Sequence, residues 1–300
     1  IIPYLTLSNV TLSSNRATNY GGGGMYNDRS SATLSNVTLS NNTATSNGGA
    51  MYNDNSSPTI SQSKFIGNTA ADVGGAMFNN VNSSVKVSNS SITGNKANWG
   101  GAVFKEGGGT DTFLNCTIAG NYASNDGGGI NTKTAGSITN LSNTIVYGNT
   151  NGSQASDIRN DGGAATINVN YSSYGVVTGT IAGGNNKANT DPKFTDAASG
   201  DYTLKTVSPA IGAGNNSLYT NNGGNLTADK DLAGSPRLTG SNVDMGAYED
   251  QTIVLQPNAT GIVYVSQNGA GSFNGSSWAN AAPELADALL AAKTNTAIKQ

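Results

Sequence analysis

The chain lacks histidine, has a single cysteine and carries few charges: 11% of its 300 residues are charged, and the formal net charge is −3. Without histidine, the commonest proton shuttle and metal ligand is missing. The lone Cys116 has no disulfide partner, so we expect a buried, unreactive thiol. The negative net charge argues against nucleic-acid binding. No apolar run approaches the ~20 residues that a membrane-spanning helix needs.

What the chain does have is a repeat. A glycine pair followed by a small and then an apolar residue begins at Gly22, Gly48, Gly74, Gly100 and Gly127, at steps of 26 or 27 residues. A second motif with the same period places an apolar residue three positions before an asparagine, as in Phe65 and Asn68. Self-similarity at such a period indicates a solenoid, in which each coil buries its apolar face against the next coil.

The composition of the repeats identifies the kind of solenoid. They consist of Ser, Thr, Asn, Gly and short apolar strings, which favour strands and corners over helices. About 26 residues accommodate three short strands and three turns, and successive coils would pair as parallel strands about 4.8 Å apart. We therefore predict an all-β fold, a right-handed parallel β-helix with three strands per coil, its hand following the preference of parallel crossovers.

Two columns of amide side chains fall at the expected corners of the coils. The first column contains Asn9, Asn36, Gln62, Asn89, Asn115 and Asn143. The second contains Asn15, Asn42, Asn68, Asn95, Asn121 and Asn149. Asparagine tolerates the left-handed backbone of a tight corner, and stacked amides hydrogen-bond from coil to coil. We expect both columns to be structural ladders.

Two further columns are candidates for a surface or ligand-binding stripe. The first is aromatic and contains Tyr26, Tyr52, Phe78 and Phe104, each directly after an apolar residue of the glycine motif. Strand alternation places either these rings or the preceding apolar residues inside. We favour the core or a packed flank for the rings. Facing outward, they would form a stripe suited to sugar rings or a partner surface.

The second candidate column is polar and contains Asp28, Asp54, Asn80 and Glu106. Asp28 and Asp54 would lie about 5 Å apart on adjacent coils, a separation that suits the carboxyl pair of a retaining glycosidase. Any repeated polar position gives the same spacing, so we expect no catalysis and no cofactor. Weak Ca²⁺ binding is the alternative kept open for this pair.

The chain divides into four parts by pattern. We expect regular coils over residues 1–150, irregular closing coils of the same β-helix over 151–250, a linker over 251–261, and a strand followed by a helix over 262–300. The expected helix lies around Glu284 to Lys293, with apolar residues at helical spacing and Pro283 just inside its start. Such a unit is typical of the cap that begins a β-helix, so the last part reads as the start of a next module.

Several of these motifs resemble a known family. The alternation of GGAM and GGAV with FIGN at 65–68 resembles the paired GGA(I/L/V) and FxxN motifs of polymorphic outer membrane protein repeats. DPKF at 191–194, GDYTL at 200–204, SPAIGAG at 208–214 and VDMGAYE at 243–249 resemble the closing segment of pectin-lyase-like β-helix modules in secreted Bacteroidota proteins. The stretch from 264 to 279 is similar to the opening of such modules.

These resemblances imply a non-enzymatic, extracellular protein of the cell surface, part of a giant adhesin or filament at the outer membrane. Its expected partners are other copies of itself, in tandem or head to tail through the uncapped coil at Ile1, and glycans or a host surface. Because the same fold also hosts polysaccharide lyases and glycosidases, a carbohydrate-binding or carbohydrate-degrading β-helix is the alternative.

Overall fold

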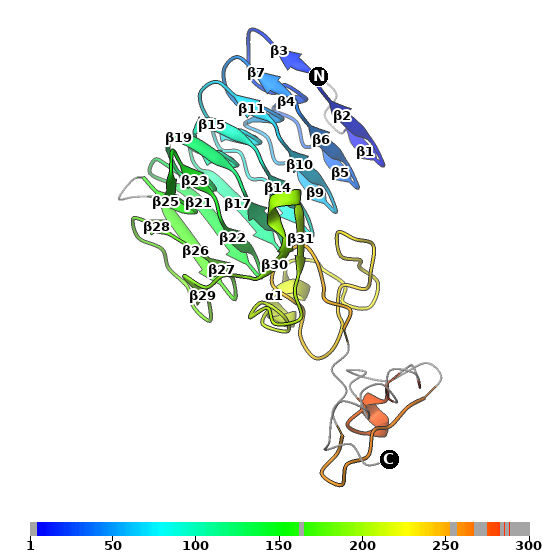
Figure 1. The fold of residues 1–300 in the computed structure, drawn as a ribbon. Helices are drawn as coiled ribbons and strands as arrows, with labels where there is room; N and C mark the ends of the chain where they lie inside the picture. The colour runs from blue at the N-terminus through cyan, green and yellow to red at the C-terminus, as the bar shows by residue number, and fades with distance from the viewer. Residues whose placement is uncertain are drawn as a thin grey trace.

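A computed structural model describes residues 5–161, 165–252, 257–266 and 275–282, together with 285 and 288. Its strands wind into a right-handed parallel β-helix of about six turns (Figure 1). Four parallel sheets run along the axis, and we name them A to D in chain order. Neighbouring strands of a sheet belong to successive coils and pair in parallel, except for one antiparallel pair within a single coil at the end of sheet C. Among the described residues, no helix has both the length and the apolar character to cross a bilayer.

The strands of each sheet recur once per coil. Sheet A contains β1 (Thr6–Ser8), β5 (Thr33–Ser35), β9 (Thr59–Ser61), β13 (Lys86–Ser88), β17 (Gly109–Leu114), β21 (Ser137–Ser142) and β26 (Thr166–Asn170). Sheet B contains β2 (Thr11–Ser13), β6 (Thr38–Ser40), β10 (Lys64–Ile66), β14 (Ser91–Thr93), β18 (Thr117–Ala119), β22 (Ile145–Tyr147), β27 (Ser173–Tyr174) and β29 (Lys187–Ala188). Sheet C contains β3 (Arg16–Ala17), β7 (Thr43–Ala44), β11 (Thr69–Ala70), β15 (Lys96–Trp99), β19 (Tyr122–Asp126), β23 (Thr150–Asn151) and β24 (Gln154–Ala155). Sheet D contains β4 (Met25–Asp28), β8 (Met51–Asp54), β12 (Met77–Asn80), β16 (Val103–Lys105), β20 (Ile130–Thr132), β25 (Ile158–Asn160) and β28 (Val177–Thr178).

The regular coils therefore have four strands, where the sequence predicted three. The additional strand belongs to sheet C and is as short as the two residues of β3. Two residues show no alternation of apolar and polar side chains, so this strand is indistinguishable from a turn in the sequence. The expected parallel β-helix with a period near 26 residues is otherwise confirmed.

Left-handed residues turn the chain at the corners. All six members of the first amide column have positive φ, between 47° and 57°. At the next corner, the left-handed residue directly precedes the asparagine of the second column, as Gly67 (φ 64°) does before Asn68. The glycine pair marks a third corner, where a Cβ on Gly74 (φ 68°) would lie 2.2 Å from the carbonyl oxygen of Met77. Only glycine fits that close approach, which explains why this motif is the clearest anchor of the repeat.

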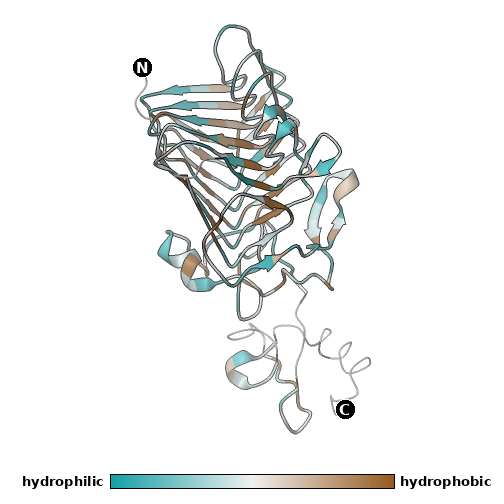
Figure 2. Ribbon diagram, turned by 90° about the vertical axis from the view of Figure 1, so that its left-hand side faces the viewer, coloured by the Kyte–Doolittle hydropathy of each residue, from teal (hydrophilic) through white to brown (hydrophobic). Residues whose placement is uncertain are grey.

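The core lies inside the coils and consists of apolar residues from sheets A, B and D. Leu34, Leu39 and Met51 represent the three columns in one coil, and each is completely buried. Figure 2 shows the apolar residues following the strands along the stack. Alternation along β8 places Met51 and Asn53 inside, and Tyr52 and Asp54 outside.

Residues 191–250 do not form the closing coils that we expected. The coils continue only through β29; the chain then forms the hairpin of β30 (Phe194–Asp196) and β31 (Asp201–Leu204), with the 3₁₀ turn η1 (Ala197–Ser199) between them, and later α1 (Asn216–Asn221). We call residues 191–250 the return segment, because after the last coil the chain turns back and packs on the outer face of sheet B. Ile145 packs there against Ala210 and Met245 in a second apolar cluster. Outward apolar side chains on sheet B thus provide a surface that the segment covers.

The described part of 257–288 contains the 3₁₀ turn η2 (Trp278–Asn280) and one parallel bridge between Val265 and Ala282. The strand expected at 262–265 is limited to that bridge. Of the helix expected around 284–293, only 285 and 288 lie among the described residues, and both are helical. Four residues of the predicted linker, 253–256, lie outside the described residues.

Candidate functional site

The second amide column forms a continuous ladder inside the solenoid. Asn68 Oδ1 accepts hydrogen bonds from the backbone N–H and the Nδ2 of Asn42, at 2.9 and 3.0 Å. The Nδ2 of Asn68 in turn donates to Asn95 Oδ1 at 2.8 Å. At the far end, the backbone N–H and the Nδ2 of Asn149 both donate to Asp157 Oδ1 at 2.9 Å. Because these amides bond to one another, the column joins coils and leaves little capacity for a ligand.

The first amide column faces outward, and only part of it forms the expected ladder. Asn36 Nδ2 donates to Asn9 Oδ1 at 2.7 Å, and Asn143 Nδ2 donates to Asn115 Oδ1 at 3.1 Å. Three amides of the column donate to the return segment: Asn89 to the Tyr219 hydroxyl at 2.7 Å, Gln62 to the Lys230 carbonyl at 3.4 Å, and Asn115, which also accepts from Asn143, to the Asp244 carbonyl at 2.9 Å. The column therefore anchors a separate part of the chain.

A third amide column, not identified from the sequence, lies on the inner face of sheet D. Asn27 Nδ2 donates to Asn53 Oδ1 at 2.7 Å, and Asn53 Nδ2 donates to Asn79 Oδ1 at 2.8 Å. In the next coil Lys105 takes this position, and Asn79 Nδ2 donates to Asp111 Oδ2 at 2.6 Å. The five side chains are buried. The signal in the sequence was an asparagine directly after the aromatic residue in three successive coils.

The aromatic column lies on the outer face of sheet D, not in the core. Its rings follow one another along the axis: Tyr26 meets Tyr52 edge to face with centroids 5.0 Å apart, Tyr52 stacks on Phe78 at 4.9 Å, and Phe78 lies tilted against Phe104 at 5.9 Å. Tyr26 is 45% exposed, whereas Phe78 and Phe104 are 3% exposed. The rings therefore do not belong to the core: Phe78 and Phe104 form a packed flank, whereas the end at Tyr26 is an open, outward-facing stripe.

The polar column lies on the same outer face, two residues further along each strand. Asp28, Asp54 and Asn80 are register partners on adjacent strands. Asn80 Nδ2 donates to the Tyr52 hydroxyl at 3.1 Å, which ties the two columns together. Burial, with smaller contributions from Asp54 and Asp28, raises the pKa of the Tyr26 hydroxyl. The open part of this face therefore presents tyrosine rings beside carboxylates and an amide.

The geometry at the carboxylates favours binding over catalysis. Asp28 forms an ion pair with the neighbouring Arg29 at 3.2 Å, and the Asp28 side chain is 41% exposed. The Asp28 carboxylate is thus partly open to water and already has a cationic partner. Within the described residues, no cluster of side chains is suited to hold a metal ion.

Beside the covered rings is a cavity of about 260 Å³, lined among others by Phe78, Phe104, Trp99, Asp72 and Glu106. The cavity thus lies between the buried end of the aromatic column and side chains from the neighbouring corner with sheet C. Glu106, the last member of the predicted polar column, thus lies at a cavity, away from the open tyrosines.

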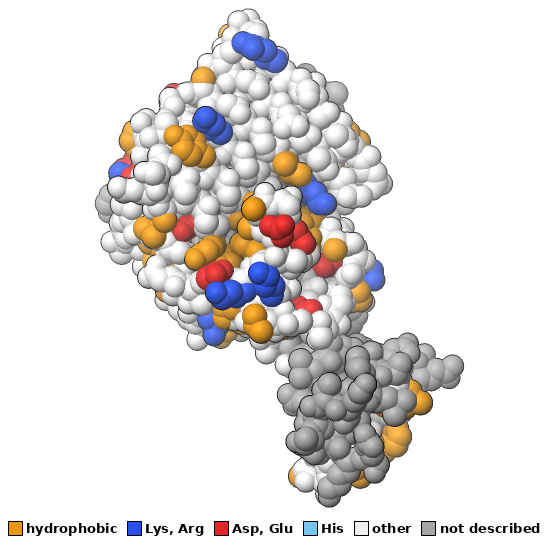
Figure 3. Space-filling view, viewed as in Figure 1, with side chains coloured by type: hydrophobic (Ala, Val, Ile, Leu, Met, Phe, Trp, Pro, Cys, Tyr) orange, Lys and Arg blue, Asp and Glu red, His pale blue; other side chains and the backbone are white. Residues whose placement is uncertain are grey.

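A larger cavity of 490 Å³ lies between the return segment and the corner of sheets B and C. Tyr147, Phe194 and Tyr202 line it together with Lys193 and Lys205. Figure 3 shows charged and apolar side chains gathered over the hairpin β30–β31, whereas the neighbouring coils are mostly covered by uncharged polar groups. Because Lys193 Nζ is bound to Asp191 at 2.9 Å, one of the two cations is already neutralised.

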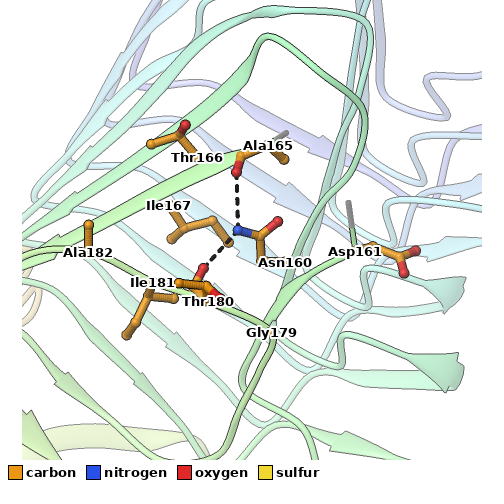
Figure 4. Close-up of a pocket in the computed structure, with 9 residues that line it drawn as sticks. All are labelled: Asn160, Asp161, Ala165, Thr166, Ile167, Gly179, Thr180, Ile181 and Ala182. Atoms are coloured by element: carbon orange, nitrogen blue, oxygen red, sulfur yellow. Dashed lines mark hydrogen bonds between the residues drawn. The ribbon is translucent and has the colours of Figure 1, made fainter. Parts of the chain in front are cut away.

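The largest of these cavities, 540 Å³, lies at the last coils, between the ends of β25 and β28 and the start of β26 (Figure 4). Asn160 crosses it and donates to the carbonyl oxygens of Thr180 at 2.7 Å and Ala165 at 3.2 Å. These bonds hold the loops together, and Ile167 and Ile181 form the apolar lining.

Comparison of the chain with protein-family models, with curated proteins and with solved structures finds no match.

Proposed function

We propose that this chain is a segment of a non-enzymatic, extracellular surface protein in which the β-helix serves as a stiff rod, either as an adhesin or as part of a filament. The observation that carries the proposal is the use of the buried amides: both interior columns, represented by Asn68 and Asn53, are bonded along the axis from coil to coil. Such axial bonds oppose separation of the coils and suit an elongated, load-bearing role.

The return segment and the surface support the same role. The segment covers the outer face of sheet B and fixes itself to outward amides such as Asn89 and Asn115. The remaining coil surface is rich in uncharged Ser, Thr and Asn. The resemblance to polymorphic outer membrane protein repeats and to β-helix modules of Bacteroidota supports a location at the cell surface, at the outer membrane.

The arrangement of copies is the second part of the proposal. The cap-like region 262–300 supports modules in covalent tandem or in head-to-tail contact. Its described part has packing of its own, since the rings of Tyr264 and Trp278 lie 5.0 Å apart and Val263 and Val265 pack with Ala282. In this proposal the region stacks on the first coil of the next copy.

Electron microscopy of the native material and of the purified chain tests this arrangement. We expect a thin fibre with a regular axial repeat, and loss of end-to-end chains of molecules when residues 262–300 are deleted. Isolated particles from both the native material and the intact chain would contradict the filament proposal. Unchanged chains after the deletion would contradict the role of 262–300.

A second candidate function, carbohydrate binding, is favoured by one specific observation. The exposed ring of Tyr26 meets Tyr52 edge to face, and the carboxylates of Asp28 and Asp54 lie on the same side of the sheet. Aromatic faces bind the apolar faces of sugar rings, and carboxylates accept hydrogen bonds from sugar hydroxyls. This face would then provide the adhesive contact with a glycan.

A glycan panel tests the second candidate. We expect binding that is lost in Tyr26→Ala with Tyr52→Ala and reduced in Asp28→Asn with Asp54→Asn. Tyr122→Ala, which removes a ring from the outer side of sheet C, is the matched control and should bind normally. Binding that survives the tyrosine substitutions, or an intact chain that binds no glycan, would exclude this face. Cleavage of a bound glycan would instead support the enzymatic alternative.

A further inference from the structure

Lys105 is a buried cation in the middle of the β-helix, at a position where the three preceding coils have asparagine. Its Nζ donates to the carbonyl oxygen of Ser83 at 2.5 Å and lies 3.8 Å from Asp111 Oδ1. Both charged side chains are 0% exposed. Burying an ion pair costs more desolvation than an amide pair would, so the ladder does not explain why lysine stands here.

The neighbouring amide shares the same carboxylate. Asn79 Nδ2 donates to Asp111 Oδ2 at 2.6 Å, while Asn79 Oδ1 accepts from Asn53 Nδ2 at 2.8 Å. Asn79 and Lys105 are register partners on β12 and β16. Paired strands lie about 4.8 Å apart, a distance that a lysine side chain easily spans. An amine, an amide and a carboxyl group thus meet in a dry interior.

The surroundings favour the uncharged forms of both titratable groups. Burial lowers the pKa of the Lys105 amine, against the opposing effect of Asp111. Burial likewise raises the pKa of Asp111 to about 6. An uncharged amine is a nucleophile, and an uncharged carboxylic acid is a proton donor.

We propose that Lys105 and Asn79 form an intramolecular amide bond between adjacent coils, with Asp111 as the acid–base group. The Nζ of Lys105 attacks the side-chain carbonyl carbon of Asn79, and the carbon–Nδ2 bond breaks. Asp111 takes a proton from Nζ and delivers one to Nδ2, which leaves as ammonia. The exchange is balanced without an oxidant, a metal or a cofactor.

Each group around Asn79 has a defined part in this reaction. The hydrogen bond from Asn53 Nδ2 is directed at Asn79 Oδ1, the oxygen on which negative charge develops during attack. The hydrogen bond from Asn79 Nδ2 to Asp111 marks the path of the proton to the leaving group. The Ser83 carbonyl holds the lysine amine at the site before reaction.

The product would be a covalent link between one coil and the next. It joins two residues that are 26 positions apart, 79 and 105, in a chain whose single cysteine excludes an intramolecular disulfide. A cross-link within the stack prevents the linked coils from separating under tension and restricts the unfolded chain, as a disulfide does. The inference stands on the interior geometry and does not depend on the proposed function.

Mass spectrometry of the full, unfolded chain tests the proposal. We expect an intact mass lower than that of the sequence by one ammonia molecule. After unfolding and trypsin digestion, cleavage after Lys105 should be blocked, and the peptide 65–86 should be joined to the peptide 97–133. The substitutions Lys105→Arg and Asn79→Ala should restore the full mass, and Asp111→Asn should slow or abolish the loss. Lys133→Arg, at an exposed lysine, is the control and should show the loss and the joined peptides unchanged.

Three results would overturn the proposal. One is an intact mass equal to that of the sequence after prolonged incubation of the folded chain. Another is a loss of ammonia with separate peptides 97–105 and 106–133, which would indicate a succinimide at an asparagine. The third is a loss of water with a bond between Lys105 and Asp111, which would exclude Asn79. Because the wild-type chain alone decides among these results, a variant that fails to fold does not weaken the test.

Discussion

The two predicted asparagine columns share a residue type and a period, yet they have different roles in the folded chain. The inner column, represented by Asn68, is bonded to its own copies along the axis. The outer column, represented by Asn115, is bonded in part to its own copies and in part to the return segment. The comparison shows that an amide column becomes a closed ladder where burial leaves no other partner, and an attachment site where it faces outward.

Desolvation explains the difference. A buried amide without a partner costs about 1–3 kcal/mol for each unsatisfied group, so the inner amides must bond to each other. Water satisfies an outward amide at little cost, and any segment that packs nearby can replace that water. Both interior columns also end at buried aspartates, Asp157 and Asp111, which accept the last amide hydrogens.

The largest expected effect comes from breaking the inner ladder. Asn68→Ala removes the hydrogen bond from Nδ2 to Asn95 Oδ1. It also removes the acceptor Oδ1, to which the backbone N–H and the Nδ2 of Asn42 donate. We expect a loss of about 4 kcal/mol in the free energy of unfolding, measured by chemical denaturation. The matched outer substitution is Asn36→Gly, which retains the left-handed corner and should cost less than about 1 kcal/mol. Equal losses at the two positions would contradict the comparison.

The carboxyl end of the sheet D ladder predicts a pH dependence. Because burial raises the pKa of Asp111 from its ordinary 3.8 to about 6, the folded chain holds this proton more tightly than the unfolded chain does. The contribution of Asp111 to the free energy of unfolding is therefore largest below pH 3.8, where the carboxyl group is protonated in both states. This contribution is lost as the pH rises through the folded-state pKa of about 6. The decrease amounts to at most about 3 kcal/mol.

Unfolding free energies between pH 3.5 and 7, a range of about three and a half units around that window, measure this slope in the wild type and in Asp111→Asn. The slope attributable to Asp111 should be absent from the variant. We compare the change of the unfolding free energy with pH in the two proteins and not its absolute value, because a cross-link at Lys105 would change the absolute value at every pH. Identical slopes in both proteins would show that the carboxyl group does not titrate in this range.

The smallest expected effect concerns the outer column. Asn115→Gly removes the hydrogen bond to the Asp244 carbonyl and the acceptor for Asn143. We expect a local loss of about 1 kcal/mol, seen as faster amide hydrogen exchange in the return segment and unchanged exchange in the inner strands. Faster exchange throughout the coils would mean that the outer column holds the solenoid together as the inner one does.

The period and the inward columns were readable from the sequence because they follow local rules. Glycine pairs whose first member has positive φ, together with alternating apolar residues such as Leu34, determine the shape of one coil, and repetition of the coil determines the stack. The left-handed outer corners were predictable for the same reason. The inner asparagine after Tyr52 was also visible, but its inward direction depends on the register of a four-residue strand.

Other features were decided only by the tertiary structure, because they depend on contacts between residues that are distant in the sequence. The path of residues 191–250 depends on the outer face of sheet B, where Ala210 and Met245 pack against Ile145. Packing across coils likewise buries Phe78 and Phe104. It also brings Lys105 next to Asp111. Local conformational preferences thus determined the repeating coil, whereas burial across the assembled coils determined which side chains became core, attachment site or reactive cluster.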